Sequence, residues 1–106
     1  MTWNLKYLPE AQNDLKKLDG SIRPGIIKGI IKVSRNPDTD GYGKPLGNKS
    51  GTNLVGLYKI KFRDSGIRVV YKLVRSASEM LVIVISARAD DYAYKLAVRR
   101  RSKHGL

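Results

Sequence analysis

Residues 58–71 read Tyr58-Lys59-Ile60-Lys61-Phe62-Arg63-Asp64-Ser65-Gly66-Ile67-Arg68-Val69-Val70-Tyr71. Apolar and cationic side chains alternate on both sides of Asp64-Ser65-Gly66, and a period of two is typical of strands with one buried face. The Asp-Ser-Gly segment is typical of a tight turn between two strands. The stretch therefore predicts a β-hairpin, with Lys59, Lys61 and Arg63 on one face of its first strand.

The flanking segments predict one further strand on each side of this hairpin. Residues 3–7 alternate apolar and polar side chains, as in a short strand with one buried face. Residues 80–85 form a continuous apolar run, which is typical of a central strand covered on both faces.

Three helices are predicted around these strands. The first opens at Pro9, the second follows Ser21 as its N-cap, and the third spans roughly residues 90–103. We expect one α+β domain over residues 1–106, in the order β-α-α-β-β-β-α. It consists of a small antiparallel β-sheet with an N-terminal helical hairpin and a C-terminal helix, all packed on one face.

Residues 36–53 are rich in Gly, Pro, Asn and Ser and predict a long loop. Long ordered loops in small domains are often functional, although a flexible connector has the same composition. The two interpretations are equally supported.

The charge of the chain indicates a polyanionic partner. Its 21 Lys and Arg against nine Asp and Glu give a formal net charge of +12. Nucleic acid is the leading class of partner, followed by an acidic protein and an anionic membrane surface. The chain contains no cysteine, so a disulfide or a thiolate metal site is excluded. The first residues lack a secretory signal pattern and no apolar run is long enough to span a bilayer, so we expect a cytoplasmic protein without a membrane segment.

The row Lys59, Lys61 and Arg63 has a pitch of roughly 6.5–7 Å, the distance between alternate residues of a strand. That pitch is close to the spacing of phosphates along a nucleic-acid strand, so the row can follow a backbone. A solvated outer face is the alternative, and the two interpretations are about equally supported by the spacing alone.

The remaining residues limit the chemistry. His104 is the only histidine, and Asp90-Asp91 is the only close carboxylate pair, so neither a two-histidine nuclease nor a metal or other cofactor is expected. RNA supplies its own nucleophile, the 2′-hydroxyl, so Arg, Lys and Tyr could cleave it by positioning and charge stabilisation. We therefore consider a metal-independent endoribonuclease.

Three motifs resemble the RelE/ParE superfamily of toxins. The hairpin has the form Y-K-I-K-x-R-x-x-G-x-R-x-V-Y of RelE-type toxins. The closing strand and the Arg-to-Tyr segment of that family are similar to residues 84–88 and 92–97. The first helix is similar to residues 10–18.

The resemblance implies the toxin of a toxin–antitoxin module, a ribosome-dependent mRNA endonuclease that enters the A site. Its partners would be the ribosome, mRNA and an acidic antitoxin that wraps the toxin in a hetero-oligomer. The implied catalytic residues are Lys59, Lys61, Arg68, Arg88 and Tyr94. Lysines would contact phosphates and transfer protons, arginines would stabilise the transition state, and Tyr94 would stack on RNA or help activate the 2′-hydroxyl.

Some assignments stay open. The family often carries Arg in the loop that corresponds to residues 46–49. This chain has no Arg there, and Lys44 or Lys49 would take its place. Tyr92 is an alternative to Tyr94 as the functional tyrosine. Further candidate RNA contacts are Arg63, Arg99 and Arg100, although the basic helix end could equally be solvated. Two alternative functions are a ParE-like inhibitor of DNA gyrase and an RNA-binding module without catalysis.

Overall fold

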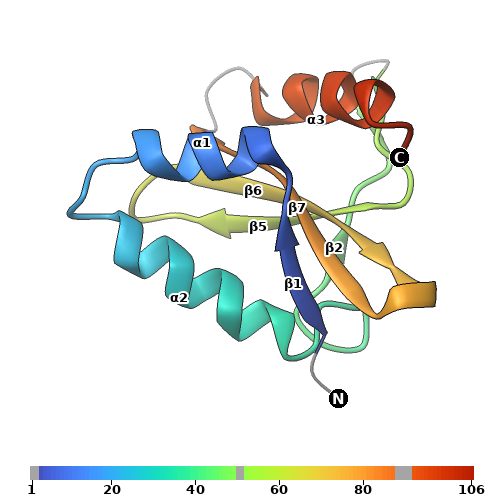
Figure 1. The fold of residues 1–106 in the computed structure, drawn as a ribbon, viewed down its shortest axis with the longest axis horizontal. Helices are drawn as coiled ribbons and strands as arrows, with labels where there is room; N and C mark the ends of the chain where they lie inside the picture. Colours follow the sequence, from blue (N-terminus) through green and yellow to red (C-terminus); the bar gives the residue numbers. More distant parts are fainter. Residues whose placement is uncertain (1–2, 50–51, 88–91) are drawn as a thin grey trace.

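The computed structural model describes residues 3–49, 52–87 and 92–106. Its centre is the meander β5 (Leu57–Phe62), β6 (Ile67–Val74) and β7 (Glu79–Ala87), in which neighbouring strands are antiparallel (Figure 1). Gly66 has a φ of 69° in the turn between β5 and β6, a conformation that glycine adopts without strain. The predicted hairpin is confirmed, and the fold class is α+β.

The sheet is mixed, which corrects the expectation of an antiparallel sheet. The strand order is β1-β7-β6-β5-β2, and β1 (Asn4–Tyr7) runs parallel to β7 at one edge. The alternation in residues 3–7 predicts a strand but carries no information about its neighbour or direction. Strand β1 supplies backbone hydrogen bonds along the edge of β7 that β6 does not occupy.

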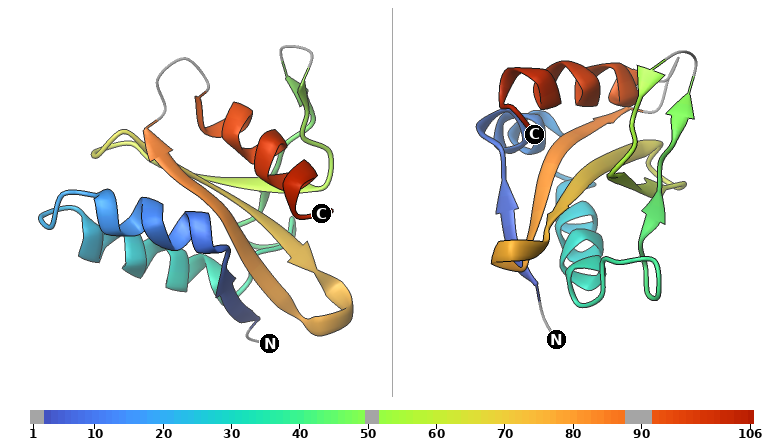
Figure 2. Two further views of the ribbon diagram at one scale, coloured as in Figure 1. Left: turned by 45° about the horizontal axis from the view of Figure 1, so that its top comes forward. Right: turned by 90° about the vertical axis from the view of Figure 1, so that its right-hand side faces the viewer.

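The helices lie on both faces of the sheet, which corrects the expectation that they share one. Helix α2 (Arg23–Ser34) packs over β5, where a Cβ added at Gly29 would collide with the Phe62 ring. Helix α3 (Tyr92–Lys103) covers the opposite face, so the strands run between α2 and α3 (Figures 1 and 2). This arrangement explains why the apolar run in β7 is buried on both sides.

Helix α1 (Pro9–Lys17) continues the edge of the sheet beyond the end of β1. The Ile85 amide donates to Asp14 Oδ2 at 3.1 Å, a bond that a neighbouring strand would otherwise supply. Pro9 stands in the first turn as predicted. Ser21 does not cap α2: the N-cap is Ile22, and the Ser21 amide donates instead to Asp19 Oδ1 at 2.9 Å.

The predicted loop of residues 36–53 contains three strands of two residues each. Strand β2 (Lys44–Pro45) pairs with β5 and forms the other edge of the main sheet. Strands β3 (Asn48–Lys49) and β4 (Thr52–Asn53) pair only with each other. Segments of two residues have no measurable period, so the composition alone predicted a loop.

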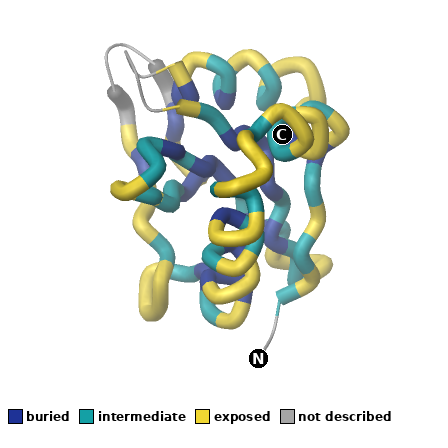
Figure 3. Tube along the Cα trace, turned by 90° about the vertical axis from the view of Figure 1, so that its left-hand side faces the viewer, coloured by how far each residue is buried: buried dark blue, intermediate teal, exposed yellow. Residues whose placement is uncertain are grey.

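A tube coloured by burial shows how the core is arranged: the buried positions run along the strands, and exposed positions follow the outer faces of the helices (Figure 3). A short 3₁₀ turn, η1 (Arg75–Ala77), connects β6 to β7. No helix within the described ranges is long and apolar enough to cross a membrane.

Candidate nucleic-acid interface

Two pairs of cations face each other across neighbouring strands. Lys44 of β2 lies opposite Lys59 of β5, and Lys61 of β5 lies opposite Arg68 of β6. Like charges placed directly opposite one another destabilise a sheet. In the part of the chain that the structure describes, no ion pair joins Lys44 or Lys61 to a carboxylate. An arrangement that disfavours folding is typical of a site built to bind an anion.

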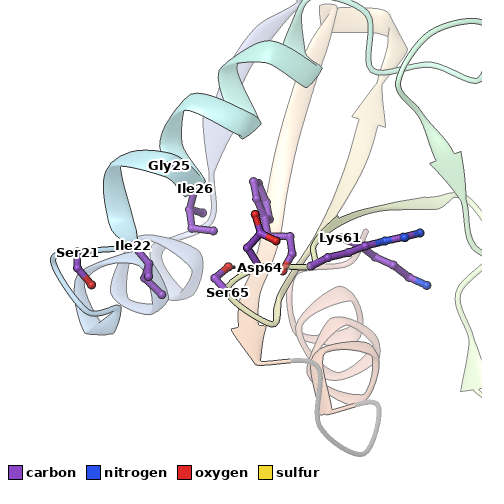
Figure 4. Close-up of a pocket in the computed structure, with 9 residues that line it drawn as sticks. Ser21, Ile22, Gly25, Ile26, Lys61, Asp64 and Ser65 are labelled. Carbon is purple, nitrogen blue, oxygen red and sulfur yellow. Dashed lines mark hydrogen bonds between the residues drawn. The ribbon is translucent and has the colours of Figure 1, made fainter.

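Phe62 meets α2 at Gly29, so alternation along β5 turns Lys59 and Lys61 towards the opposite face of the sheet. Lys61 points away from the α2 residues Ile22 and Ile26 in the close-up view (Figure 4). The cavity drawn there lies between the start of α2 and the turn after β5; its volume is about 580 Å³, and its lining includes Ile22 and Ile26 of α2 as well as Lys61 and Arg63. On the face of β5 that Tyr58 shares with Phe62, which meets α2, Tyr58 stacks on Tyr71 with 5.3 Å between ring centroids. One face of the hairpin is therefore core, and the other carries charge.

Arg63 lies just beyond β5, in the turn, and is exposed. The predicted row of three strand positions thus consists of two strand lysines followed by a turn arginine. The three side chains still line one cavity, of about 210 Å³, together with Lys44 and Tyr42.

Arg68 and Tyr94 contact each other between β6 and α3. The Arg68 guanidinium carbon lies 4.8 Å from the centroid of the Tyr94 ring, a cation–π contact. Tyr94 is 2% exposed, so its ring is covered by the protein in this conformation. Tyr92, the competing tyrosine, is 52% exposed. Tyr94 therefore lies against Arg68 inside the protein, whereas the ring of Tyr92 is accessible to a ligand.

The three arginines of α3 have different surroundings. Arg99 is exposed. Arg100 is 13% exposed and forms an ion pair with Asp14, with 2.6 Å between Nη1 and Oδ2. Its Nη1 also donates to the Ile83 carbonyl at 2.9 Å. Arg101 donates to the Val55 carbonyl at 2.6 Å and to the Leu106 carbonyl at 3.0 Å. Arg100 is thus engaged inside the protein, and Arg99 is the one whose side chain is open to a polyanion.

Two further candidates are only partly placed. Lys49 stands in β3, outside the main sheet, and only its backbone position is described. Arg88 lies outside the described residues, directly after Ala87, which ends β7 opposite Ile67. Their assigned roles stay predictions.

A polar network attaches the segment before β2 to the sheet. Asp38 forms an ion pair with Arg75, with 2.6 Å between Oδ2 and Nη1, and the adjacent guanidinium lowers the pKa of Asp38 to about 2. The buried Tyr71 hydroxyl donates to the Pro37 carbonyl at 2.7 Å. Burial raises the pKa of Tyr71, so it remains a neutral donor. The network fixes the chain just before Lys44, and no pattern in the sequence indicated it.

His104 lies at the end of α3 and bonds to Glu10 of α1, with 2.9 Å between Nε2 and Oε2. This bond is the main reason why the pKa of Glu10 falls to about 2. Searching the described ranges for groups of three or more His, Cys, Asp or Glu that could hold a metal ion finds none.

The chain is similar to known bacterial proteins. No family model matches it. A RelE-like toxin protein of Escherichia coli is 30% identical over 100 residues, which cover 94% of this chain and 98% of that protein. The mRNA interferase toxin RelE of Escherichia coli strain K12 is 28% identical over the same length, with the same coverage.

Solved structures agree with the sequence relatives. A variant of the E. coli toxin RelE in the free state superposes with a TM-score of 0.76 at 26% identity, over 94% of this chain and 98% of that one. The fold and its cationic hairpin thus define a toxin of the RelE type. The chain belongs to the RelE-like toxin family.

Proposed function

We propose that the chain is the toxin of a toxin–antitoxin module and that it acts in the cytoplasm as an mRNA interferase, cleaving translated mRNA in the ribosomal A site. The observation that carries the proposal is the placement of cations directly opposite one another on neighbouring strands, Lys44 of β2 opposite Lys59 and Lys61 opposite Arg68. Membership of the RelE-like family supports it, because a relative of similar length is an mRNA interferase toxin. The family evidence also favours the nuclease over a gyrase inhibitor.

The proposed chemistry is a transesterification that uses the RNA itself. The 2′-hydroxyl loses its proton and attacks the adjacent phosphorus, the bond to the 5′-oxygen breaks, and that oxygen takes up a proton. The products are a 2′,3′-cyclic phosphate and a 5′-hydroxyl, so water is not the nucleophile; in this proposal the cations of the protein take the place of a metal ion. The energy barrier falls mainly because fixed cations stabilise the extra negative charge on the phosphate.

Residues of the cationic face have distinct proposed roles in this step. Lys59 and Lys61 contact the phosphates and transfer protons, since they lie on adjacent outward positions of one strand. Arg68 and Arg88 stabilise the transition state. Arg is suited to this task because its planar fork can contact two phosphate oxygens at once. Tyr94 positions Arg68 through the ring contact at 4.8 Å and is a candidate for activating the 2′-hydroxyl.

The proposed partners follow from the charge and the family. A RelE variant is known in complex with a peptide of its antitoxin RelB, and that RelE chain is 26% identical to this one. We infer a cognate acidic antitoxin, partly disordered until it binds, that covers the cationic face in a hetero-oligomer.

Inducible expression in a bacterial host tests the function. We expect growth arrest accompanied by new 5′ ends of mRNA that are phased with codons in translated regions. An Arg68→Ala variant should lower the yield of these ends by on the order of a hundredfold, as for loss of a transition-state charge donor. Arrest with intact mRNA and double-strand DNA breaks would instead identify a gyrase inhibitor.

A further inference from the structure

The small cavity beside the cationic face has an aromatic wall that the cleavage chemistry does not use. Its walls combine apolar, aromatic and cationic side chains, all described by the structure: Val33, Tyr42, Lys44, Lys59, Ile60, Lys61 and Arg63. None of these lining residues is acidic. The cavity lies between the second half of β5 and the segment that precedes β2, whose first residue, Lys44, pairs with Lys59.

Tyr42 is presented to solvent on a well-anchored backbone. Its side chain is 46% exposed. The Tyr42 amide donates to the Asn36 carbonyl at 2.8 Å, and the next amide, of Gly43, donates to the Asp38 carbonyl at 2.8 Å. A Cβ at Gly43 would collide with the Pro37 carbonyl, so this turn is wound too tightly for other residues. The backbone that carries the ring is thus held by hydrogen bonds, so binding costs little backbone entropy at this residue.

A cation lies over the Tyr42 ring. The Lys32 ammonium lies 5.3 Å from the ring centroid, in a cation–π contact. Protein aromatics of this kind bind unpaired RNA bases by stacking, whereas cations nearby hold the phosphate that follows or precedes the base. Here Lys44, Lys59 and Lys61 line the same cavity as the ring.

The size of the cavity limits which part of an RNA nucleotide can enter it. About 210 Å³ is below the roughly 300 Å³ at which pockets for whole small molecules begin. The space therefore accommodates one planar base, with Val33 and Ile60 as its apolar floor, while the sugar and phosphate remain outside on the lysines.

We propose that Tyr42, Val33 and Ile60 form a base-stacking subsite for a single-stranded RNA nucleotide that neighbours the phosphate bound by Lys59 and Lys61. The inference deepens the proposed function, because it assigns the nucleotide next to the cut a protein pocket of its own. The subsite contributes affinity and positions the strand, and it takes no part in proton transfer.

The test is binding of a fluorescein-labelled RNA oligonucleotide, 2′-O-methylated throughout so that it cannot be cut, measured by fluorescence anisotropy with the purified chain. Tyr42→Ala should weaken binding about tenfold, within the range measured when a stacking aromatic is removed. Tyr42→Phe keeps the ring and should bind as the unmodified chain does. Ile31→Ala is the matched control, since Ile31 is 45% exposed on α2 and does not line the cavity.

A scan with single abasic nucleotides locates the contact. Removing the base at one position should weaken binding of the unmodified chain about tenfold and should not weaken Tyr42→Ala further, because the same contact is already lost. Unchanged binding by Tyr42→Ala, equal losses for both chains at every position, or no binding by the unmodified chain would overturn the subsite.

This assay needs neither ribosomes nor cleavage, so it separates the subsite from the nuclease activity. A chain that binds the oligonucleotide through Tyr42 but leaves translated messages intact keeps the subsite and loses the proposed activity. Codon-phased cleavage together with unchanged binding by Tyr42→Ala would support the proposed activity and overturn the subsite.

Discussion

Lys61 and Arg68 stand opposite each other on β5 and β6, and substitutions at this pair can distinguish a functional role from a stabilising one. Because two like charges repel, replacing one of them should leave the fold as stable as before or make it more stable. We predict that Lys61→Ala keeps or raises the midpoint of thermal unfolding and lowers ribosome-dependent cleavage on the order of a hundredfold, as for loss of a proton-transfer group.

The control for that variant is Lys17→Ala, which removes an exposed lysine from α1. It should change neither cleavage nor stability appreciably, because isolated surface substitutions have small effects. A clear fall in the unfolding temperature of Lys61→Ala would show that the cationic pair stabilises the fold, contrary to our interpretation.

Tyr94 combines a buried ring with a candidate chemical role, and two substitutions separate them. Tyr94→Phe keeps the ring under Arg68, so the thermal midpoint should stay close to that of the unmodified chain. If the hydroxyl helps to activate the 2′-hydroxyl of RNA, single-turnover cleavage on ribosomes should fall in this variant. Tyr94→Leu removes the aromatic face and should lower both stability and cleavage. Full cleavage by Tyr94→Phe would restrict Tyr94 to supporting Arg68.

Sequence reasoning at the residue scale succeeded where periodicity carries the information. The alternation in residues 58–63 correctly placed Lys59 and Lys61 opposite the core-facing side. It could not place Lys44 opposite Lys59, because β2 has only two residues and a segment that short shows no alternation of apolar and polar side chains. The position of Arg100 could have been found: Ala93, Ala97 and Arg100 follow at spacings of four and three, which puts them on one helix face.

At the scale of elements, one ion pair attaches α3 to α1. Both side chains of Arg100 and Asp14 are 13% exposed, so removing one leaves the other charge nearly buried. We predict that Arg100→Leu lowers the free energy of unfolding by about 3–5 kcal/mol, the range found when one partner of a buried pair is removed.

Urea denaturation measures that change, and Arg99→Leu on the exposed side of the same helix is the matched control. The control should stay within about 0.5 kcal/mol of the unmodified chain. Equal effects of the two substitutions would mean that the ion pair does not hold α3 in place.

The same two helices meet at Glu10, whose contact with His104 makes stability depend on acid. The pKa of Glu10 is lowered from 4.5 to about 2, so its stabilising effect is complete above about pH 4.5 and is lost as the pH falls towards 2. Glu10→Gln should therefore flatten the fall in the thermal midpoint between these pH values. If the thermal midpoint of Glu10→Gln falls with pH just as that of the unmodified chain does, the assignment is contradicted. Some fall should remain in the variant, because the pKa of Asp38 is also lowered.

The element order was predicted well and the spatial arrangement less well. Both hairpin strands, the buried β7 and all three helices were expected. The parallel pairing of β1 with β7 and the placement of α2 and α3 on opposite faces were not. These features depend on contacts between distant segments, for which a single sequence carries no periodic signal.

At the scale of the whole molecule, the net charge of +12 alone indicated only some polyanion. The fold concentrates part of that charge on one face of a hairpin, and α3 covers the neighbouring strands of the same face. An antitoxin that binds there must neutralise the same cations that the proposed RNA substrate requires. On this proposal, inhibition by an acidic antitoxin and affinity for RNA both follow from the same surface.

The central claim is that the chain cleaves RNA with the RNA's own 2′-hydroxyl. Its most direct test uses purified chain, programmed ribosomes and messages in which one A-site nucleotide at a time is a 2′-deoxynucleotide. Cleavage should disappear only when the deoxynucleotide lies immediately 5′ of the cut phosphate, and the all-ribose message should yield a 2′,3′-cyclic phosphate. Undiminished cleavage of every deoxy-substituted message would contradict the account.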